Sequence, residues 1–192
     1  GGVHVSLNPE DAMLNTFDAL CICEGEIATL ELIEQLEKGS LPSGIANLWI
    51  KHDTEIEKNP LRPFLQDLDS LPFPDREMWQ EWINEPESRQ AILLGRGCPF
   101  KCTYCCNHAL NKLTTGNYVR FRSPNNILDE IKEIVKKFPT TKDIYLEVET
   151  VGAAKNDWIF ELCSKIESFN RERPQPIAFG VNVRVNRHND KL

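Results

Sequence analysis

The sequence predicts an α/β fold organised in two modules, and three observations support this. Segments with the composition of strands alternate with helical segments along most of the 192 residues, as in layered α/β proteins. Charge is uneven, since residues 1–90 carry 6 Lys or Arg against 18 Asp or Glu, whereas residues 91–192 carry 16 against 11. A proline-rich stretch, NPLRPFLQDLDSLPFPD (59–75), separates the modules and is expected to be extended.

The front module has a pattern of helix, strand, helix and strand. PEDAMLNTF (9–17) predicts a short helix, ALCIC (19–23) a buried strand and NLWIK (47–51) a second strand. Between the strands, EGEIATLELIEQLEKG (24–39) predicts an amphipathic helix. Its apolar positions recur at steps of three and are Ile27, Leu30, Ile33 and Leu36.

The second module predicts a parallel sheet with right-handed crossovers, because strands and helices alternate along it. The expected elements are a strand at 90–95, a helix at 123–138, a strand at 143–149, a helix at 156–169 and a strand at 177–183. Ser123 is a candidate N-cap of the first helix, and Pro124 fits its first position. The apolar stripes of the two helices are Ile127, Ile131, Ile134, Val135 and Phe138, and Trp158, Leu162, Cys163, Ile166 and Phe169.

Composition excludes several classes of protein. No apolar run approaches the ~20 residues that span a bilayer, and the first residues have no features of a signal peptide. We therefore expect a cytoplasmic protein with no membrane span, in which thiols stay reduced. Lys and Arg are scattered, so no nucleic acid is expected as a partner, and the positive half suits a small anionic ligand.

GRGCPFKCTYCCNH (95–108) places four cysteines and a histidine directly after a predicted strand, where parallel α/β folds bind ligands. A reduced compartment argues against a disulfide knot. Zinc needs four ligands, and the adjacent Cys105 and Cys106 cannot easily both face one metal. The spacing of Cys98, Cys102 and Cys105 favours a [4Fe–4S] cluster with one iron left open, and zinc stays the alternative.

The segment GCPFKCTYC (97–105) resembles the CxxxCxxC signature of radical SAM enzymes, including the aromatic residue before the last cysteine. The resemblance implies that Cys98, Cys102 and Cys105 ligate a [4Fe–4S] cluster whose open iron binds S-adenosylmethionine (SAM). It implies that one electron cleaves SAM to a 5′-deoxyadenosyl radical, and that Tyr104 lies against the adenine. The implied partners are a small-molecule substrate and an electron donor such as ferredoxin or flavodoxin.

The same resemblance implies further contacts to SAM. Glu147 and Glu149, in LEVET, are candidates for the SAM amino group, although related proteins often have two aspartates there. Arg184, in VNVRVN, resembles an arginine that meets the SAM carboxylate or ribose, with a surface ion pair as the alternative. Cys106 and His108 match no ligand position and are expected to be bystanders. No residue is assigned to the chemistry on the substrate.

Two segments outside the cysteine loop also resemble this family. YVRFRSP (118–124) resembles the segment before the second helix, where Arg120 and Arg122 are expected to be structural. LDSLPFPDR (68–76) resembles the linker that precedes the radical SAM barrel.

The turns GGVH (1–4) and CEGE (23–26) of the front module resemble the GG-x-H and GEGE turns in the last part of the Rossmann-like domain of cobalamin-dependent radical SAM proteins. A DxHxxG-type motif, whose histidine can ligate cobalt, is absent from the sequence, and His4 does not match its position. The resemblance nevertheless implies candidate contacts to cobalamin. They are Gly1, Gly2, His4 and Gly25.

Together these resemblances imply the C-terminal piece of a cobalamin-binding domain at 1–55, a linker at 56–89 and the N-terminal half of a parallel (β/α) radical SAM partial barrel at 90–192. The sequence begins without Met, so we expect a fragment. The implied function is reductive cleavage of SAM coupled to cobalamin-dependent methylation or rearrangement of a small molecule. The alternatives are a radical SAM enzyme whose front domain has lost cobalamin, and a non-catalytic zinc-binding module.

Overall fold

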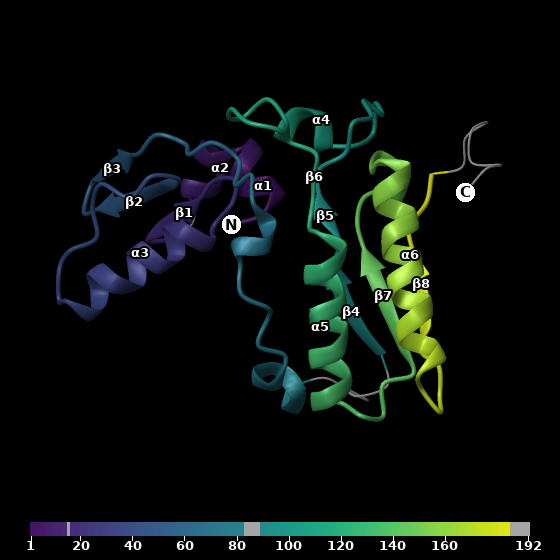
Figure 1. Cartoon of the computed structure of the whole chain (residues 1–192). Helices are drawn as coiled ribbons and strands as arrows, with labels where there is room; N and C mark the ends of the chain where they lie inside the picture. The colour runs from purple at the N-terminus through teal and green to yellow at the C-terminus, as the bar shows by residue number, and fades with distance from the viewer. Residues whose placement is uncertain (15, 83–88, 185–192) are drawn as a thin grey trace. The chain divides into compact units, whose positions relative to one another are not determined.

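The computed structural model describes residues 1–14, 16–82 and 89–184 (Figure 1), and the chain forms two compact units. Unit 1 comprises Gly1–Gln66 and Phe100–Tyr118, and unit 2 comprises Asp67–Pro99 and Val119–Leu192. The chain therefore passes from one unit to the other inside the proline-rich stretch, inside the cysteine loop and again after Tyr118. Each unit is described by itself below.

Unit 1 contains a three-stranded sheet of order β1-β2-β3, in which the described pairings are antiparallel. Its elements are α1 (Val3–Leu7), α2 (Pro9–Met13), β1 (Ala19–Cys21), α3 (Glu26–Glu37), β2 (Leu48–His52), β3 (Glu55–Lys58) and α4 (Asn107–Leu110). The predicted alternation of helix and strand is confirmed. The sequence pattern did not predict α1, β3 or the antiparallel direction of the strands. β3 forms because a hairpin at Asp53, with φ 50°, turns the chain back onto β2.

Both faces of this sheet are covered by helices. Leu20 packs with Val5 and Met13 on one face, whereas Leu48 and Ile50 pack with Ala28 on the other. Successive strand residues point to opposite faces, so a short strand such as β1 serves both cores. The result is a small helix–sheet–helix layering.

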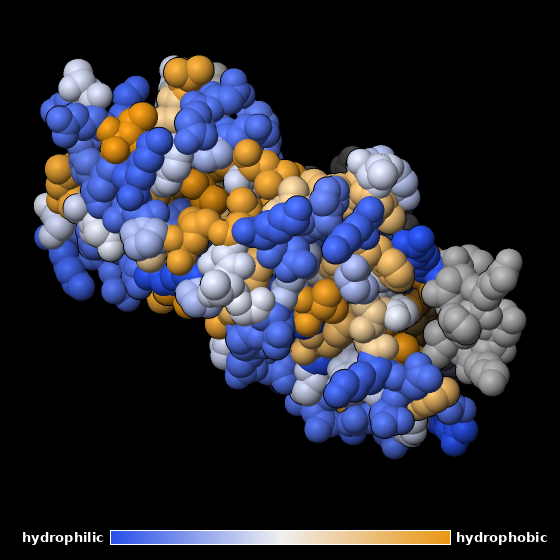
Figure 2. All heavy atoms as spheres, turned by 90° about the horizontal axis from the view of Figure 1, so that it is seen from above, coloured by the Kyte–Doolittle hydropathy of each residue, from blue (hydrophilic) through white to orange (hydrophobic). Residues whose placement is uncertain are grey.

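The apolar stripe predicted for α3 is not buried. Ile27, Leu30, Ile33 and Leu36 are 43%, 58%, 47% and 55% exposed, and Ala28 is the buried residue of this helix. The prediction of a helix is correct, but the face that meets the sheet is centred on Ala28. Hydrophobic residues accordingly reach the surface of the molecule among the hydrophilic ones (Figure 2).

Unit 2 is built on the predicted parallel sheet, with the order β4-β7-β8. Its main elements are β4 (Arg89–Leu93), α5 (Pro124–Lys137), β7 (Asp143–Glu147), α6 (Asn156–Arg171) and β8 (Ala178–Val181). The shorter elements are η1 (Leu68–Ser70), η2 (Glu77–Trp82), β5 (Gly95–Arg96), β6 (Arg120–Phe121) and η3 (Val151–Ala153). Figure 1 shows α5 and α6 side by side on one face of the sheet.

The core of unit 2 lies between these helices and the sheet, and it confirms the stripe on α5. Ile127 and Ile131 are fully buried, and Ile134 is 1% exposed. The Ser123 hydroxyl accepts a hydrogen bond from Asn126 N at 3.1 Å, so the predicted N-cap is confirmed as well. On α6 the buried residue is Leu162, and Cys163 is exposed, which corrects its assignment to the apolar face.

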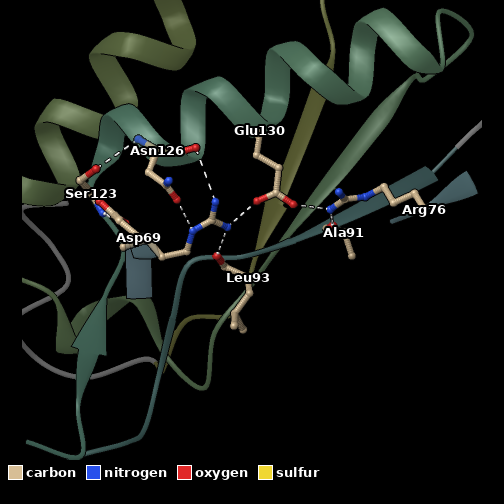
Figure 3. A network of polar contacts seen from close by, with 8 residues as sticks. Asp69, Arg76, Ala91, Leu93, Ser123, Asn126 and Glu130 are labelled. Atoms are coloured by element: carbon tan, nitrogen blue, oxygen red, sulfur yellow. Dashed lines mark hydrogen bonds and ion pairs between the residues drawn. The ribbon is translucent and has the colours of Figure 1, made fainter. Parts of the chain in front are cut away.

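A buried polar network joins the segment before β4 to α5 (Figure 3). Glu130, 1% exposed, accepts from Arg76 at 2.5 Å and also accepts from Arg122. Arg76 in addition donates to the Ala91 carbonyl at 2.6 Å, and Arg122 donates to the Leu93 carbonyl at 2.9 Å. The carboxylate is thus shared between two cations that both hold β4.

The segment 68–76 belongs to unit 2 through further contacts. Asp69 accepts from Ser123 N at 2.9 Å, Leu68 is 3% exposed, and the Arg122 guanidinium lies 5.5 Å from the centre of the Phe73 ring. The Trp158 indole donates to the Arg122 carbonyl at 2.8 Å. The prediction that Arg122 is structural is therefore confirmed.

None of the helices within the described ranges combines the length and the apolar character that a bilayer crossing requires.

Candidate functional site

The cysteine loop leaves unit 2 from a closely packed strand junction. Leu94 N donates to the Glu147 carbonyl, and Arg122 N donates to the Leu94 carbonyl, both at 2.9 Å. Gly95 then pairs with Phe121, and a Cβ on Gly95 would lie 2.3 Å from the Arg120 carbonyl oxygen. Only glycine fits this approach of β5 to β6. The start of the loop is therefore fixed by backbone pairing on two sides.

All seven cysteines lie in the described ranges and are reduced, with no disulfide between them. Cys98, Cys102, Cys105 and Cys106 are half-buried, and Cys105 N donates to the Cys102 carbonyl at 3.1 Å, which closes a turn between these two residues. Cys98 belongs to unit 2, whereas the other three belong to unit 1. Across the ranges that the structure describes, no three His, Cys, Asp or Glu side chains are arranged to hold a metal ion.

The sulfur of Cys105 has a polar neighbour that the motif does not identify. Asn107 Nδ2 donates to Cys105 Sγ at 3.5 Å, and the Tyr118 hydroxyl donates to Asn107 Oδ1 at 2.5 Å. The neighbouring Cys106 directly precedes α4, and His108 lies within α4. The thiols of Cys98, Cys102 and Cys105 are reduced and half-buried, and that of Cys105 accepts a hydrogen bond, so the chemistry of this donor set fits an iron–sulfur cluster.

Tyr104, the residue expected at the adenine, is 91% exposed. The exposed ring can stack on a planar ligand. The contact of Tyr104 with the adenine stays a prediction.

Three of the predicted SAM contacts lie at the carboxyl edge of the parallel sheet. Glu147 ends β7, Glu149 follows two residues later, and both are exposed. Arg184, also exposed, follows β8, and its backbone N donates to Thr150 Oγ1 at 3.3 Å. The structure thus brings the exits of β7 and β8 together. Thr150, 2% exposed, is a buried polar residue that pattern analysis does not single out.

The candidate cobalamin contacts lie in unit 1. His4 is in α1 and pairs with Asp11 at 3.3 Å on the surface. Gly2 has φ 97°, a conformation that favours glycine, and it precedes α1. Gly25 is the N-cap of α3, and Gly1 lies near the Cys21 carbonyl. These positions stay predictions.

The two cysteines of the front unit are poor candidates for ligands. Burial raises the pKa of the Cys23 thiol to about 11, with a further rise from the carboxylate of Glu24. Burial also raises the pKa of the Cys21 thiol. A thiol must lose its proton to bind a metal, so both side chains act as packing residues, although they are half-buried rather than buried as predicted.

Residues 92–180 match the family described as the radical SAM superfamily. The matched residues extend from β4 to β8.

The chain as a whole is similar to longer proteins. It is 26% identical over 196 residues to the "Uncharacterized methyltransferase PH0819" of Pyrococcus horikoshii, a match that covers 100% of this chain and 40% of that relative. Its fold resembles the cobalamin-dependent S-adenosylmethionine radical enzyme OxsB, with a TM-score of 0.65, 20% identity, and coverage of 93% of this chain and 24% of OxsB.

A second solved structure has a related fold. It is the radical S-adenosylmethionine methyltransferase TsrM from Kitasatospora setae, with a TM-score of 0.55, 16% identity, and coverage of 90% of this chain and 32% of TsrM. At these identities the structural similarity shows the fold alone. The chain spans less than half of the length of each of these three proteins.

Proposed function

We propose that this chain is part of a radical SAM enzyme in which Cys98, Cys102 and Cys105 hold a [4Fe–4S] cluster. The observation that carries the proposal is the CxxxCxxC spacing directly after the first strand of a parallel sheet that matches the radical SAM superfamily. When bound and reduced, the cluster supplies the electron that cleaves SAM to methionine and a 5′-deoxyadenosyl radical. An electron donor such as ferredoxin or flavodoxin provides that electron in a cytoplasmic protein.

The residues of unit 2 at the sheet edge suit the polar end of SAM. The carboxylates of Glu147 and Glu149 can accept hydrogen bonds from its ammonium group, and the Arg184 guanidinium can pair with its carboxylate. Their exposure at the ends of neighbouring parallel strands supports these roles. Tyr104 offers an exposed ring on which the adenine can stack.

We further propose that the whole protein uses cobalamin to methylate or rearrange a small molecule. OxsB is described as cobalamin-dependent, a TsrM structure contains cobalamin, and the Pyrococcus horikoshii relative is named a methyltransferase. Methylation is therefore favoured over rearrangement. Gly1, Gly2, His4 and Gly25 are the candidate contacts, and a front domain that has lost cobalamin is the second candidate. Equilibrium dialysis of the full-length protein with aqua-cobalamin distinguishes the two, because this chain contains only part of the domain.

Anaerobic reconstitution with iron and sulfide tests the cluster. We expect a brown protein with ~4 Fe per chain. With SAM and dithionite it should release 5′-deoxyadenosine. A colourless protein with one zinc per chain and no iron would instead support the non-catalytic zinc-binding module.

Two cysteine variants make the test specific. Cys102→Ser should abolish iron binding, whereas Cys106→Ser, a matched change in the same loop, should retain the full iron content. Loss of iron from the Cys106 variant with retention in the Cys102 variant would overturn the assignment of the ligands.

A further inference from the structure

Resting on the cluster proposed above, we propose that Asn107 raises the reduction potential of the cluster through a hydrogen bond to Cys105, and that Tyr118 fixes the orientation of the Asn107 amide. Asn107 is then a positioning residue that acts on the cluster through its ligand. All the residues involved belong to unit 1.

The geometry determines which end of the amide faces the sulfur. A ligand thiolate only accepts hydrogen bonds, and an amide has a donor NH₂ at one end and an acceptor oxygen at the other. Asn107 Nδ2 lies 3.5 Å from Cys105 Sγ, while its Oδ1 accepts from the Tyr118 hydroxyl at 2.5 Å. A flipped amide would turn its oxygen lone pairs towards the thiolate, so the thiolate selects the donor orientation of the amide, and the hydrogen bond from the phenol to Oδ1 holds the side chain in that position.

The ring of Tyr118 is itself held by the proline-rich stretch. It packs against Phe64, with ring centroids 5.2 Å apart and planes tilted by 55°, and Phe64 is 5% exposed. Phe64 N donates to the Thr115 carbonyl at 2.9 Å. Gln66 Nε2 donates to the Asn117 carbonyl at 3.4 Å, and Gln66 Oε1 accepts from Asn117 N at 3.2 Å.

These contacts connect residues 64–66 to the sulfur of Cys105 through two side chains, Tyr118 and Asn107. The amide is therefore preorganised by the fold rather than oriented only when a cluster is present. Such preorganisation makes a hydrogen bond to a metal ligand effective, because little freedom is lost when it forms.

The sign of the effect follows from charge. Reduction adds one negative charge to the cluster and its thiolates, and a hydrogen bond to a thiolate stabilises the more negative state. The bond therefore makes the cluster easier to reduce. Its removal should move the potential to a more negative value without removing a ligand.

The test is a redox titration of the reconstituted chain without SAM, followed by the EPR signal of the reduced cluster. Asn107→Leu removes the hydrogen-bond donor and keeps a side chain of similar size. At a fixed solution potential, we expect the ratio of reduced to oxidised cluster to fall about tenfold. For one electron this corresponds to a shift of the reduction potential by ~59 mV. Tyr118→Phe should shift the potential in the same direction by less. The double variant should match Asn107→Leu alone, because Tyr118 acts only through Asn107.

Asn111→Leu is the matched control, since Asn111 is exposed in the same loop just after α4, and it should leave the potential unchanged. A wild-type potential in an Asn107→Leu protein with full iron content would overturn the inference, as would additive shifts in the double variant. If the Asn107→Leu protein loses iron, the test passes to Tyr118→Phe, which deletes a single hydroxyl. A more negative reduction potential in that variant supports the inference, and a wild-type potential overturns it. Failure of the parent chain to hold a cluster would instead overturn the proposed function.

Discussion

The helices α3 and α5 have similar sequence patterns and opposite environments. Each carries isoleucines and leucines at helical spacing, but Ile131 on α5 is fully buried while Ile33 on α3 is 47% exposed. α5 packs against a parallel sheet and, at its side, against α6, whereas α3 meets its sheet through Ala28. Periodicity therefore identifies an apolar face, but the partner of that face depends on contacts distant in sequence.

The two helices also differ in their polar contacts. α5 begins at a serine cap and contains the buried Glu130, which binds two arginines. α3 has no side-chain hydrogen bond at its N-cap, and its Glu31 pairs with Arg62 at 2.6 Å, half-exposed. We therefore expect substitutions in α5 to cost far more stability than equivalent ones in α3.

The largest effect is expected for Glu130→Gln. This change keeps the size of the side chain but leaves Arg76 and Arg122 without their shared carboxylate, and removal of one partner from a buried ion pair costs about 3–5 kcal/mol. Glu133→Gln on the same helix is the control, because its pair with Lys137 at 3.2 Å lies at the surface and should contribute far less. Urea unfolding measures both, and equal losses would contradict the importance of the network.

A matched pair of isoleucine truncations tests the contrast between the stripes. Ile131→Ala should lower the free energy of unfolding by about 2–5 kcal/mol, because it leaves a cavity in the core of unit 2. Ile33→Ala on the exposed stripe should change it by about 0.5 kcal/mol or less. A comparable loss at Ile33 in urea unfolding would show that the α3 stripe is buried in solution.

The helix caps give a smaller difference. Ser123→Ala removes the hydrogen bond to Asn126 N and should cost about 1 kcal/mol. Ser164→Ala, in the exposed interior of α6, is the comparison and should be nearly neutral. Equal midpoints for Ser123→Ala and the parent protein in urea would mean that the cap does not stabilise α5.

The smallest effect concerns pH and lies in unit 1. Hydrogen bonds from the backbone of Gly44 and from the side chains of His52 and Asn59 lower the pKa of Glu57 to about 2. Because the pKa is lower in the folded than in the unfolded state, this stabilisation is present above about pH 4.5 and is lost as pH falls towards 2. Glu57→Gln should flatten that part of the stability profile, and an identical acid profile in parent and variant would contradict the assignment.

Much of unit 2 could be predicted from sequence because its signals are local. Ser123 and Pro124 mark the start of α5, and the buried strands around Ile92 and Ile144 alternate with helices, so the parallel sheet follows. The CxxxCxxC spacing likewise locates the loop at the end of the first strand. The network of Arg76, Glu130 and Arg122 could not be predicted, because its partners are 8 to 54 residues apart.

Unit 1 was harder to predict because its contacts, too, join residues that are distant in sequence. The strands β1 and β2 are short. The residues of these two strands do not indicate that the strands run antiparallel or that β3 pairs with β2. The role of Asn107 depends on Tyr118, eleven residues later, and on the Phe64 ring from the other segment of the unit. Such contacts exist only once the chain has folded.

The exposure of Cys163 on α6 has a practical consequence. Thiol reagents should modify this side chain well before Cys23, whose pKa is raised to about 11, so Cys163 is a handle for attaching a fluorophore or spin label to unit 2. The same accessibility allows air oxidation to link two chains through it during purification. A Cys163→Ser background therefore gives the cleanest material for counting iron and sulfide.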